Sequence, residues 1–195
     1  MPGENKIMDH LDAIIKISKC VDPKLIPKLI NFIDHRATKK MVTAYNKKNP
    51  TVRNVYGYSI PRVLPSDIFY WNLIQAEITR LYTFYKAKFG LIKSTEMRQI
   101  DLLKYGVGGK YNMHTDSYTM FFRTLSIIIN LNDEYEGGDL VFGDPRAMNE
   151  DVINPIHRVK MGAGDIVFFP STFLYPHQID SVQKGKRYSI VSWLA

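Results

Sequence analysis

The chain has 195 residues, 45% of them hydrophobic, so it can bury a core but is short for two domains. Its single cysteine, Cys20, excludes an internal disulfide and argues against an oxidising compartment. The N-terminus lacks the long apolar run of a signal peptide or a membrane span, which favours a cytoplasmic location. We therefore expect one domain over residues 1–195.

The chain is basic, with a formal net charge of +7. Basic proteins gain sequence-independent affinity for phosphates, which raises the possibility of nucleic-acid binding. The lysines and arginines are scattered along the chain and are not gathered with aromatic residues, which favours a solvated basic surface. Nucleic acid is not expected as a direct substrate, while attraction toward an acidic protein stays open.

The first third of the chain predicts helices and few strands. Apolar residues at helical spacing predict a helix over residues 11–19, and Asp22 with Pro23 predicts the start of a second helix. The stretch 38–62 is polar, with Asn49-Pro50 among its breakers, and predicts one or two strands.

A long helix is predicted next. Pro65 begins it, and Gly90 ends it just after Lys88. Its apolar side chains are predicted to be core residues rather than a cofactor site: Ile68, Trp71, Leu73, Ile74, Ile78, Leu81 and Phe84.

From Glu96 onward, β-branched runs alternate with turn residues, which is typical of many short strands. Residues 125–131 are apolar at nearly every position, which predicts a strand buried on both faces. Helices would then cover one face of the larger sheet. The predicted fold class is α+β, mainly β.

The most informative residues are His114, Asp116 and, far downstream, His177. A lone His-x-Asp pair is common by chance, but this one follows a loop with three glycines and has a third candidate ligand. Two imidazoles and one carboxylate on one face of an octahedral ion form the facial triad of non-heme Fe(II) oxygenases. Such a triad leaves three positions open for a co-substrate and O₂.

Arg187 lies a short hairpin beyond His177. A guanidinium there can bind a carboxylate in bidentate fashion, as a metal-bound dicarboxylate such as 2-oxoglutarate requires. If the hairpin turns near Val182, His177 and Arg187 lie opposite each other on one sheet face. Ser189 could add a hydroxyl to this carboxylate clamp. Period-two alternation sends one set of side chains inward, Arg187, Ser189, Val191 and Trp193, and sends Tyr188 and Ile190 to the other face.

Three sequence blocks, 105–116, 123–142 and 162–193, together resemble the prolyl 4-hydroxylase group of Fe(II)/2-oxoglutarate dioxygenases. The resemblance implies a double-stranded β-helix (jelly-roll, cupin-like) with N-terminal helices packed on the major sheet. Residues 96–195 would form the catalytic core, and 1–95 the helical support and substrate loops. It also implies an enzyme that uses Fe(II), 2-oxoglutarate and O₂, with ascorbate as a reductant, and yields succinate, CO₂ and a hydroxylated C–H bond.

The resemblance also suggests roles for residues beyond the iron ligands and Arg187. Tyr105 matches a tyrosine that helps hold the distal carboxylate of 2-oxoglutarate. Asn130 stands where relatives commonly have another tyrosine at this carboxylate, so that contact is either lost or made by the amide. Substrate contacts are expected from Tyr111, Arg123 and Trp193, and from Arg53 in the 43–60 loop region.

The predicted reaction is hydroxylation of a prolyl residue in a protein or peptide by a monomer or weak dimer. Two alternatives stay open: a hydroxylase of free amino acids or other small molecules, and a non-catalytic β-helix binding module. A nucleic-acid demethylase of this superfamily would carry a second arginine where Trp193 stands. An iron halogenase would lack the carboxylate of Asp116.

Overall fold

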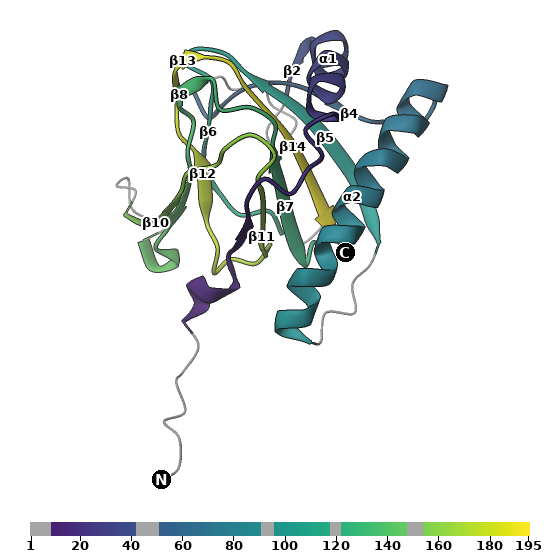
Figure 1. The fold of residues 1–195 in the computed structure, drawn as a ribbon. Helices are drawn as coiled ribbons and strands as arrows, with labels where there is room; N and C mark the ends of the chain where they lie inside the picture. Colours follow the sequence, from purple (N-terminus) through teal and green to yellow (C-terminus); the bar gives the residue numbers. More distant parts are fainter. Residues whose placement is uncertain (1–8, 42–50, 91–95, 118–121, 148–153) are drawn as a thin grey trace.

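The structure, a computed structural model, describes residues 9–41, 51–90, 96–117, 122–147 and 154–195. Two sheets face each other, and the helices lie on the outer side of the larger one (Figure 1). The elements in chain order are η1 (His10–Ala13), β1 (Ile15–Ile17), α1 (Ile26–Arg36), β2 (Lys39–Lys40), β3 (Arg53–Asn54), β4 (Tyr56–Ser59), α2 (Pro65–Phe89), β5 (Met97–Tyr105), β6 (Lys110–His114), β7 (Leu125–Asn130), β8 (Tyr135–Gly137), β9 (Leu140–Gly143), η2 (Pro145–Ala147), β10 (Pro155–Val159), β11 (Ile166–Pro170), β12 (His177–Ile179), β13 (Val182–Gly185) and β14 (Arg187–Leu194).

The sheet topology interleaves strands that are distant in sequence. The larger sheet has the order β1-β11-β7-β14-β5-β4-β2, and the smaller has the order β10-β9-β12-β6-β3. Strands β13 and β8 form a separate pair. Neighbouring strands run antiparallel. Strands that are consecutive in the chain, such as β5 and β6 or β11 and β12, lie in different sheets, so the chain repeatedly crosses from one sheet to the other. This is the jelly-roll arrangement, and the predicted mainly-β fold with helices on the major sheet is confirmed.

Strand β7 is buried on both faces, as predicted. Ile127 and Ile129 pack in the cluster beneath the helices, while Ile128 packs in the cluster between the two sheets. Period-two alternation of a strand places consecutive side chains on opposite faces, so the larger sheet separates two apolar layers. The site described below lies in the layer between the sheets.

Helix α2 supplies much of the outer layer. The predicted core residues Trp71, Ile74, Ile78 and Leu81 are buried, and Gly90 follows the helix as predicted. Two residues predicted to be core are exposed instead, Ile68 to 45% and Phe84 to 61%. The buried stripe continues through Tyr82 and Tyr85, which turns Phe84 away from the sheet. Ile68 lies in the first turns, next to the exposed Phe69.

The helix predicted over residues 11–19 is wrong. The chain makes a single 3₁₀ turn, capped by the Asp9 side chain, and then adds β1 to the open edge of β11. Pairing with an unfilled sheet edge stabilises the extended form of this β-branched segment more than an isolated helical turn could. The second helix begins at Ile26, later than predicted, after a turn in which the Asp22 carboxylate accepts a hydrogen bond from the Lys24 N–H. None of the described helices is long and apolar enough to cross a membrane.

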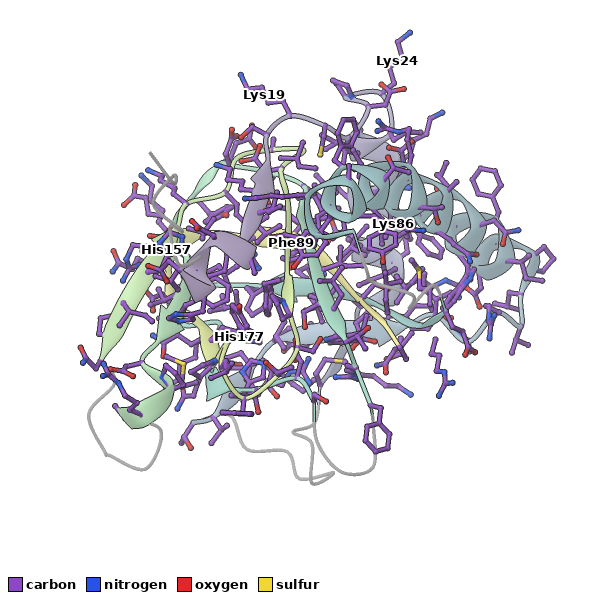
Figure 2. All side chains as sticks on the ribbon, turned by 90° about the horizontal axis from the view of Figure 1, so that it is seen from below. Lys19, Lys24, Lys86, Phe89, His157 and His177 are labelled. Carbon is purple, nitrogen blue, oxygen red and sulfur yellow. The ribbon has the colours of Figure 1, made fainter. Side chains whose placement is uncertain are left out.

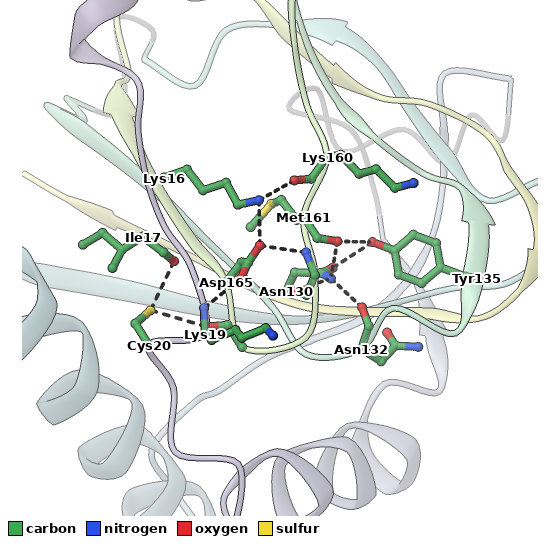
Figure 3. A network of polar contacts seen from close by, with 12 residues as sticks. Lys16, Ile17, Lys19, Cys20, Asn130, Asn132, Tyr135, Lys160, Met161 and Asp165 are labelled. Carbon is green, nitrogen blue, oxygen red and sulfur yellow. Dashed lines mark hydrogen bonds and ion pairs between the residues drawn. The ribbon is translucent and has the colours of Figure 1, made fainter.

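Asp165 ties the N-terminal strand to the loop before β11. Its buried carboxylate accepts hydrogen bonds from the Lys16 ammonium at 2.9 Å and from the backbone N–H groups of Lys19 and Gly162 at 2.9 and 2.8 Å (Figure 3). Burial alone would raise the pKa of Asp165, but these donors outweigh it and hold the pKa below its usual range. This loop also contacts the site, through Asn130.

Replacing the buried Asp165 with alanine should cost about 3 kcal/mol of unfolding free energy, because the Lys16 ammonium and two backbone donors lose their acceptor. Urea denaturation at pH 7 measures this. Because the folded-state pKa of Asp165 is lowered, its contribution is complete above the unfolded pKa and is lost as pH falls through the folded pKa. The exposed Asp12→Ala should change stability by less than about 0.5 kcal/mol. Equal effects of the two substitutions would contradict the role of Asp165.

Candidate metal centre

Two paired strands of the smaller sheet bring the candidate ligands together. His114 ends β6 and His177 begins β12, and the two are direct partners in the antiparallel register. Asp116 follows His114 by two residues. The glycine loop before β6 is tight: a Cβ at Gly109 would lie 2.6 Å from the Gly106 carbonyl oxygen, so glycine is needed there.

The three side chains converge on one point. One ligand atom from each lies within 4.8 Å of the others. The His114 and His177 Nε2 atoms each lie 3.6 Å from an Asp116 carboxylate oxygen. Asp116 and His177 are buried, whereas His114 keeps 20% of its side chain exposed. Three protein ligands on one side suit a single ion whose remaining positions stay open to exchange.

Backbone carbonyls orient both imidazoles. His114 Nδ1 lies 2.8 Å from the Asn112 oxygen, and His177 Nδ1 lies 3.1 Å from the Tyr175 oxygen. A carbonyl can only accept, so in each ring Nδ1 carries the proton and the Nε2 lone pair faces Asp116. Such outer contacts fix the tautomer that a metal requires.

The electrostatics favour the metal-binding protonation states. Burial, together with the nearby His114, lowers the pKa of His177 to about 4. Burial would raise the pKa of Asp116, but the two imidazoles and the Ser126 hydroxyl, 2.6 Å away, outweigh it and lower that pKa. At neutral pH His177 is therefore neutral and Asp116 ionised, as divalent-metal binding demands.

A buried guanidinium lies between the same two sheets. Arg187 is 1% exposed and pairs in register with Tyr105, with its guanidinium carbon 5.2 Å from the Tyr105 ring centre. Its Nη1 donates to the Ser189 hydroxyl at 2.9 Å, while Nε and Nη2 have no hydrogen-bond partner. A buried cation without a counter-ion costs several kcal/mol. The two unpartnered donors therefore form a binding site for an anion.

The predicted hairpin between His177 and Arg187 is wrong. His177 pairs with His114 and Phe142 in the smaller sheet, whereas Arg187 belongs to the larger sheet. Val182 is no turn but begins β13, which carries the chain from one sheet to the other. The predicted alternation along β14 is confirmed for three residues by the apolar clusters in which they pack. Tyr188 and Ile190 pack beneath the helices, and Val191 packs between the sheets.

Asn130 lies opposite Ser189 in the sheet register, but the hydrogen bonds of its side-chain amide are made to other groups of the protein. Its amide nitrogen donates to backbone carbonyls, including those of Met161 and Gly162 at 3.3 and 3.2 Å (Figure 3). Its amide oxygen accepts from the Tyr135 hydroxyl at 3.2 Å. With its amide hydrogens directed at carbonyls, Asn130 acts on the pocket through its neighbours.

Tyr135 was missed by the sequence reasoning. A Cβ added to Gly138 would lie 3.1 Å from Arg187 Cδ and 3.2 Å from the Tyr135 ring, so the tyrosine packs at the Arg187 end of the site. Its hydroxyl also reaches toward the Met161 carbonyl. The available signal was an aromatic residue two positions before the Gly137-Gly138 pair, where a ring can pack over a backbone without side chains.

The four predicted substrate residues form two stacked pairs. The Tyr111 ring stacks on His114 with 3.7 Å between centroids, and the Arg53 guanidinium lies 4.5 Å from the Tyr111 ring centre. The Arg123 guanidinium lies 3.7 Å from the Trp193 ring centre. Part of the predicted substrate loop, residues 43–50, lies outside the described residues.

Two lysines of the first third, Lys19 and Lys24, lie far from this site. In the view from below, Lys19 and Lys24 project outward at the far side of the molecule from His177 (Figure 2). The arginines beside the site are Arg187, Arg53 and Arg123.

A jelly roll that holds two histidines, one aspartate and a buried arginine between its sheets is the architecture of an iron-dependent oxygenase. Residues 100–195 match the model of the 2OG-Fe(II) oxygenase superfamily. The name of that superfamily states 2-oxoglutarate and Fe(II), and the donor set of His114, Asp116 and His177 fits such an ion.

Similar proteins agree with this assignment. A PKHD-type hydroxylase of Aliarcobacter butzleri is 36% identical over 101 residues, which cover 47% of this chain and 40% of that protein. One from Psychrobacter sp. is 34% identical over 100 residues, covering 46% and 35%. The chain therefore matches less than half the length of these relatives.

Solved structures agree on the fold. A prolyl hydroxylase from Trichoplax adhaerens, solved with a hypoxia-inducible factor peptide, superposes with a TM-score of 0.74 at 16% identity, over 95% of this chain and 85% of that one. A prolyl-4-hydroxylase from Pseudomonas putida gives 0.69 at 18% identity, covering 95% of both chains.

Proposed function

We propose that this protein hydroxylates a C–H bond in an Fe(II)- and 2-oxoglutarate-dependent reaction that yields succinate and CO₂, and that the target is a prolyl residue of a protein or peptide. One observation carries the proposal: a three-ligand centre and the buried Arg187 both face the layer between the two sheets, and Arg187 Nε and Nη2 have no hydrogen-bond partner. A dicarboxylate that reaches from the ion to Arg187 satisfies both requirements at once.

Each residue of the site then has a separate binding role. His114, Asp116 and His177 hold the iron, and Arg187 binds the distal carboxylate of 2-oxoglutarate, with Ser189 and Tyr105 beside it. Asn130 contributes by fixing the Met161 loop and the Tyr135 hydroxyl. The bound iron and co-substrate supply the oxidative chemistry. The chain supplies positioning and a buried environment in which each charge is paired.

The prolyl target is supported by the aromatic wall of the site. Tyr111 stacks on the candidate ligand His114, and Trp193 packs against Arg123, so aromatic rings lie beside the centre where a saturated ring could be held. The relatives named PKHD-type hydroxylase and the prolyl hydroxylase folds point the same way. A free amino acid would use the same iron and co-substrate residues and is the alternative that the experiment must separate.

A polypeptide substrate is supported by apolar side chains next to the ligand loop. Phe122 and Phe173 are 79% and 71% exposed. Their segments adjoin Asp116, because the Ser117 N–H donates to the Ser171 carbonyl and the Ser171 N–H donates to the Thr124 carbonyl. Exposed aromatics beside a pocket give a longer chain something to contact beyond the target residue. The proposal also includes one catalytic domain over 1–195, a monomer or weak dimer, ascorbate as reductant and a cytoplasmic location.

The test is succinate formation from 2-oxoglutarate by the Fe(II)-loaded protein, alone and with proline-containing peptides or free amino acids. We expect a peptide to stimulate turnover and to gain the mass of one oxygen on proline. Stimulation by a free amino acid alone would replace the peptide with a small molecule. Iron binding without any turnover would contradict the enzyme reading and favour a binding module.

A further inference from the structure

A second polar network reaches the metal centre from the larger sheet. Asp101 of β5 is 2% exposed and shares the inward face of its strand with Leu103 and Tyr105. Its Oδ1 accepts hydrogen bonds from the Ser59 hydroxyl at 2.6 Å and from the Gln99 amide nitrogen at 2.9 Å. None of these three polar residues has a part in iron or co-substrate binding as proposed above.

The network continues to a metal ligand. The Gln99 amide oxygen accepts from Arg123 Nη2 at 3.2 Å, and Arg123 Nη1 donates to the backbone carbonyl of Asp116 at 3.3 Å. We call Ser59, Asp101, Gln99 and Arg123 the polar chain. We propose that the polar chain holds the backbone of Asp116 in its ligating position, so that Asp101, Gln99 and Arg123 are positioning residues of the metal centre; this inference rests on the proposed function.

The chemistry of each group permits one direction of hydrogen bonding. The Asp101 carboxylate can only accept, so Gln99 must turn its amide nitrogen toward it. The Gln99 oxygen then faces Arg123, whose guanidinium can only donate. A buried charge at one end therefore sets the amide orientation that Arg123 needs at the other, and such chains strengthen their members by mutual polarisation.

Packing fixes the plane of the guanidinium. Trp193 is the sheet partner of Gln99, and Arg123 lies over its ring at 3.7 Å from the centroid. The Arg123 N–H lies 3.5 Å from the Ser117 hydroxyl, so Arg123 contacts both Asp116 and the residue that follows it. Asp116 is thus held twice: its side chain by Ser126 and its backbone by Arg123.

This assigns Arg123 a different role from a substrate anchor. An anchor would affect the peptide KM and leave metal binding unchanged. A positioning residue would change metal affinity before any substrate is present, and loss of such outer contacts typically weakens metal binding by about 10- to 100-fold. The two roles therefore differ in a measurement that needs no turnover.

The test is the Mn(II) dissociation constant of the full chain, measured by electron paramagnetic resonance without 2-oxoglutarate or peptide. Asp101→Asn can donate as well as accept, which lets the Gln99 amide rotate away from Arg123. Gln99→Met keeps the size of a partly exposed side chain and removes both bonds. We expect each variant to weaken Mn(II) binding about tenfold.

Asp34→Asn is the matched control. Its carboxylate is also shared in a polar contact, with Lys104 and Tyr188, but on the helical side of the larger sheet. Asp34→Asn removes one carboxylate charge, as Asp101→Asn does, and we expect it to change the Mn(II) affinity by less than twofold. Variants of Asp101 and Gln99 that bind Mn(II) like wild type, with only the peptide KM raised, would overturn the inference. A wild-type protein that binds no Mn(II) would overturn the proposed function as well.

Discussion

Asp116→Ala should abolish 2-oxoglutarate turnover and weaken metal binding by more than about 100-fold, beyond the range typical of outer contacts. Asp116 supplies the only carboxylate among the three converging ligands and lies between the two imidazoles. Its removal leaves two neutral nitrogens, which neither neutralise the ion nor complete a face of an octahedron. Succinate formation and Mn(II) titration measure the two effects.

Asp144→Ala is the control for this prediction. Asp144 is another aspartate whose pKa is lowered, to about 2, by hydrogen bonds from Arg146. It lies outside the converging group, so its loss should leave metal binding and turnover near wild-type values. Unchanged activity in Asp116→Ala would exclude the assignment of this residue as an iron ligand. Loss of activity with peptide binding retained would remain compatible with an enzyme.

The candidate metal ligands could be named from the sequence because their chemistry is local. His114 and Asp116 are two residues apart, and this spacing is retained whatever strand they end. His177 could be named from its residue type and its block. Its partner could not be named, because strand pairing across 63 residues of chain depends on the whole topology.

The failed hairpin illustrates the same limit. The sequence placed His177 and Arg187 in one hairpin, since short connections usually join neighbouring strands. In the structure, β13 pairs with β8 and carries the chain into the other sheet, so His177 and Arg187 belong to strands of two different sheets. The prediction of a shared pocket rested on the wrong geometry.

The wrong helix over residues 11–19 and the omission of Tyr135 have a related cause. The first segment is a strand only because β11 offers an open edge. Tyr135 contacts Asn130 and Gly138 close by in the chain, but its hydroxyl also reaches the Met161 carbonyl, 26 residues away. Local periodicity carries no information about such neighbours. What the sequence predicts best is therefore the ligand set, and what it predicts least well is the supporting contacts.

Arg187→Met should raise the dissociation constant for 2-oxoglutarate by roughly 100-fold or more, because loss of a charge-paired buried arginine costs about 3–5 kcal/mol. The same substitution should stabilise the metal-free, ligand-free protein, by about 1–4 kcal/mol. The guanidinium is 1% exposed and leaves Nε and Nη2 unpartnered, so the empty fold bears the cost of a buried charge. Methionine has a similar length and an adaptable apolar side chain, which can pack beside Val182 and Gly138.

Calorimetry with Mn(II)-loaded protein measures the first effect, and urea denaturation of the metal-free protein measures the second. Arg158→Met is the matched control, since Arg158 is an exposed arginine paired with Asp139 and Asp180. It should leave 2-oxoglutarate binding unchanged and give no gain in stability. Opposite signs for binding and stability are the specific expectation at Arg187, because a residue that only supports the fold would lose both together. A less stable Arg187→Met variant that still binds 2-oxoglutarate would place the anion elsewhere.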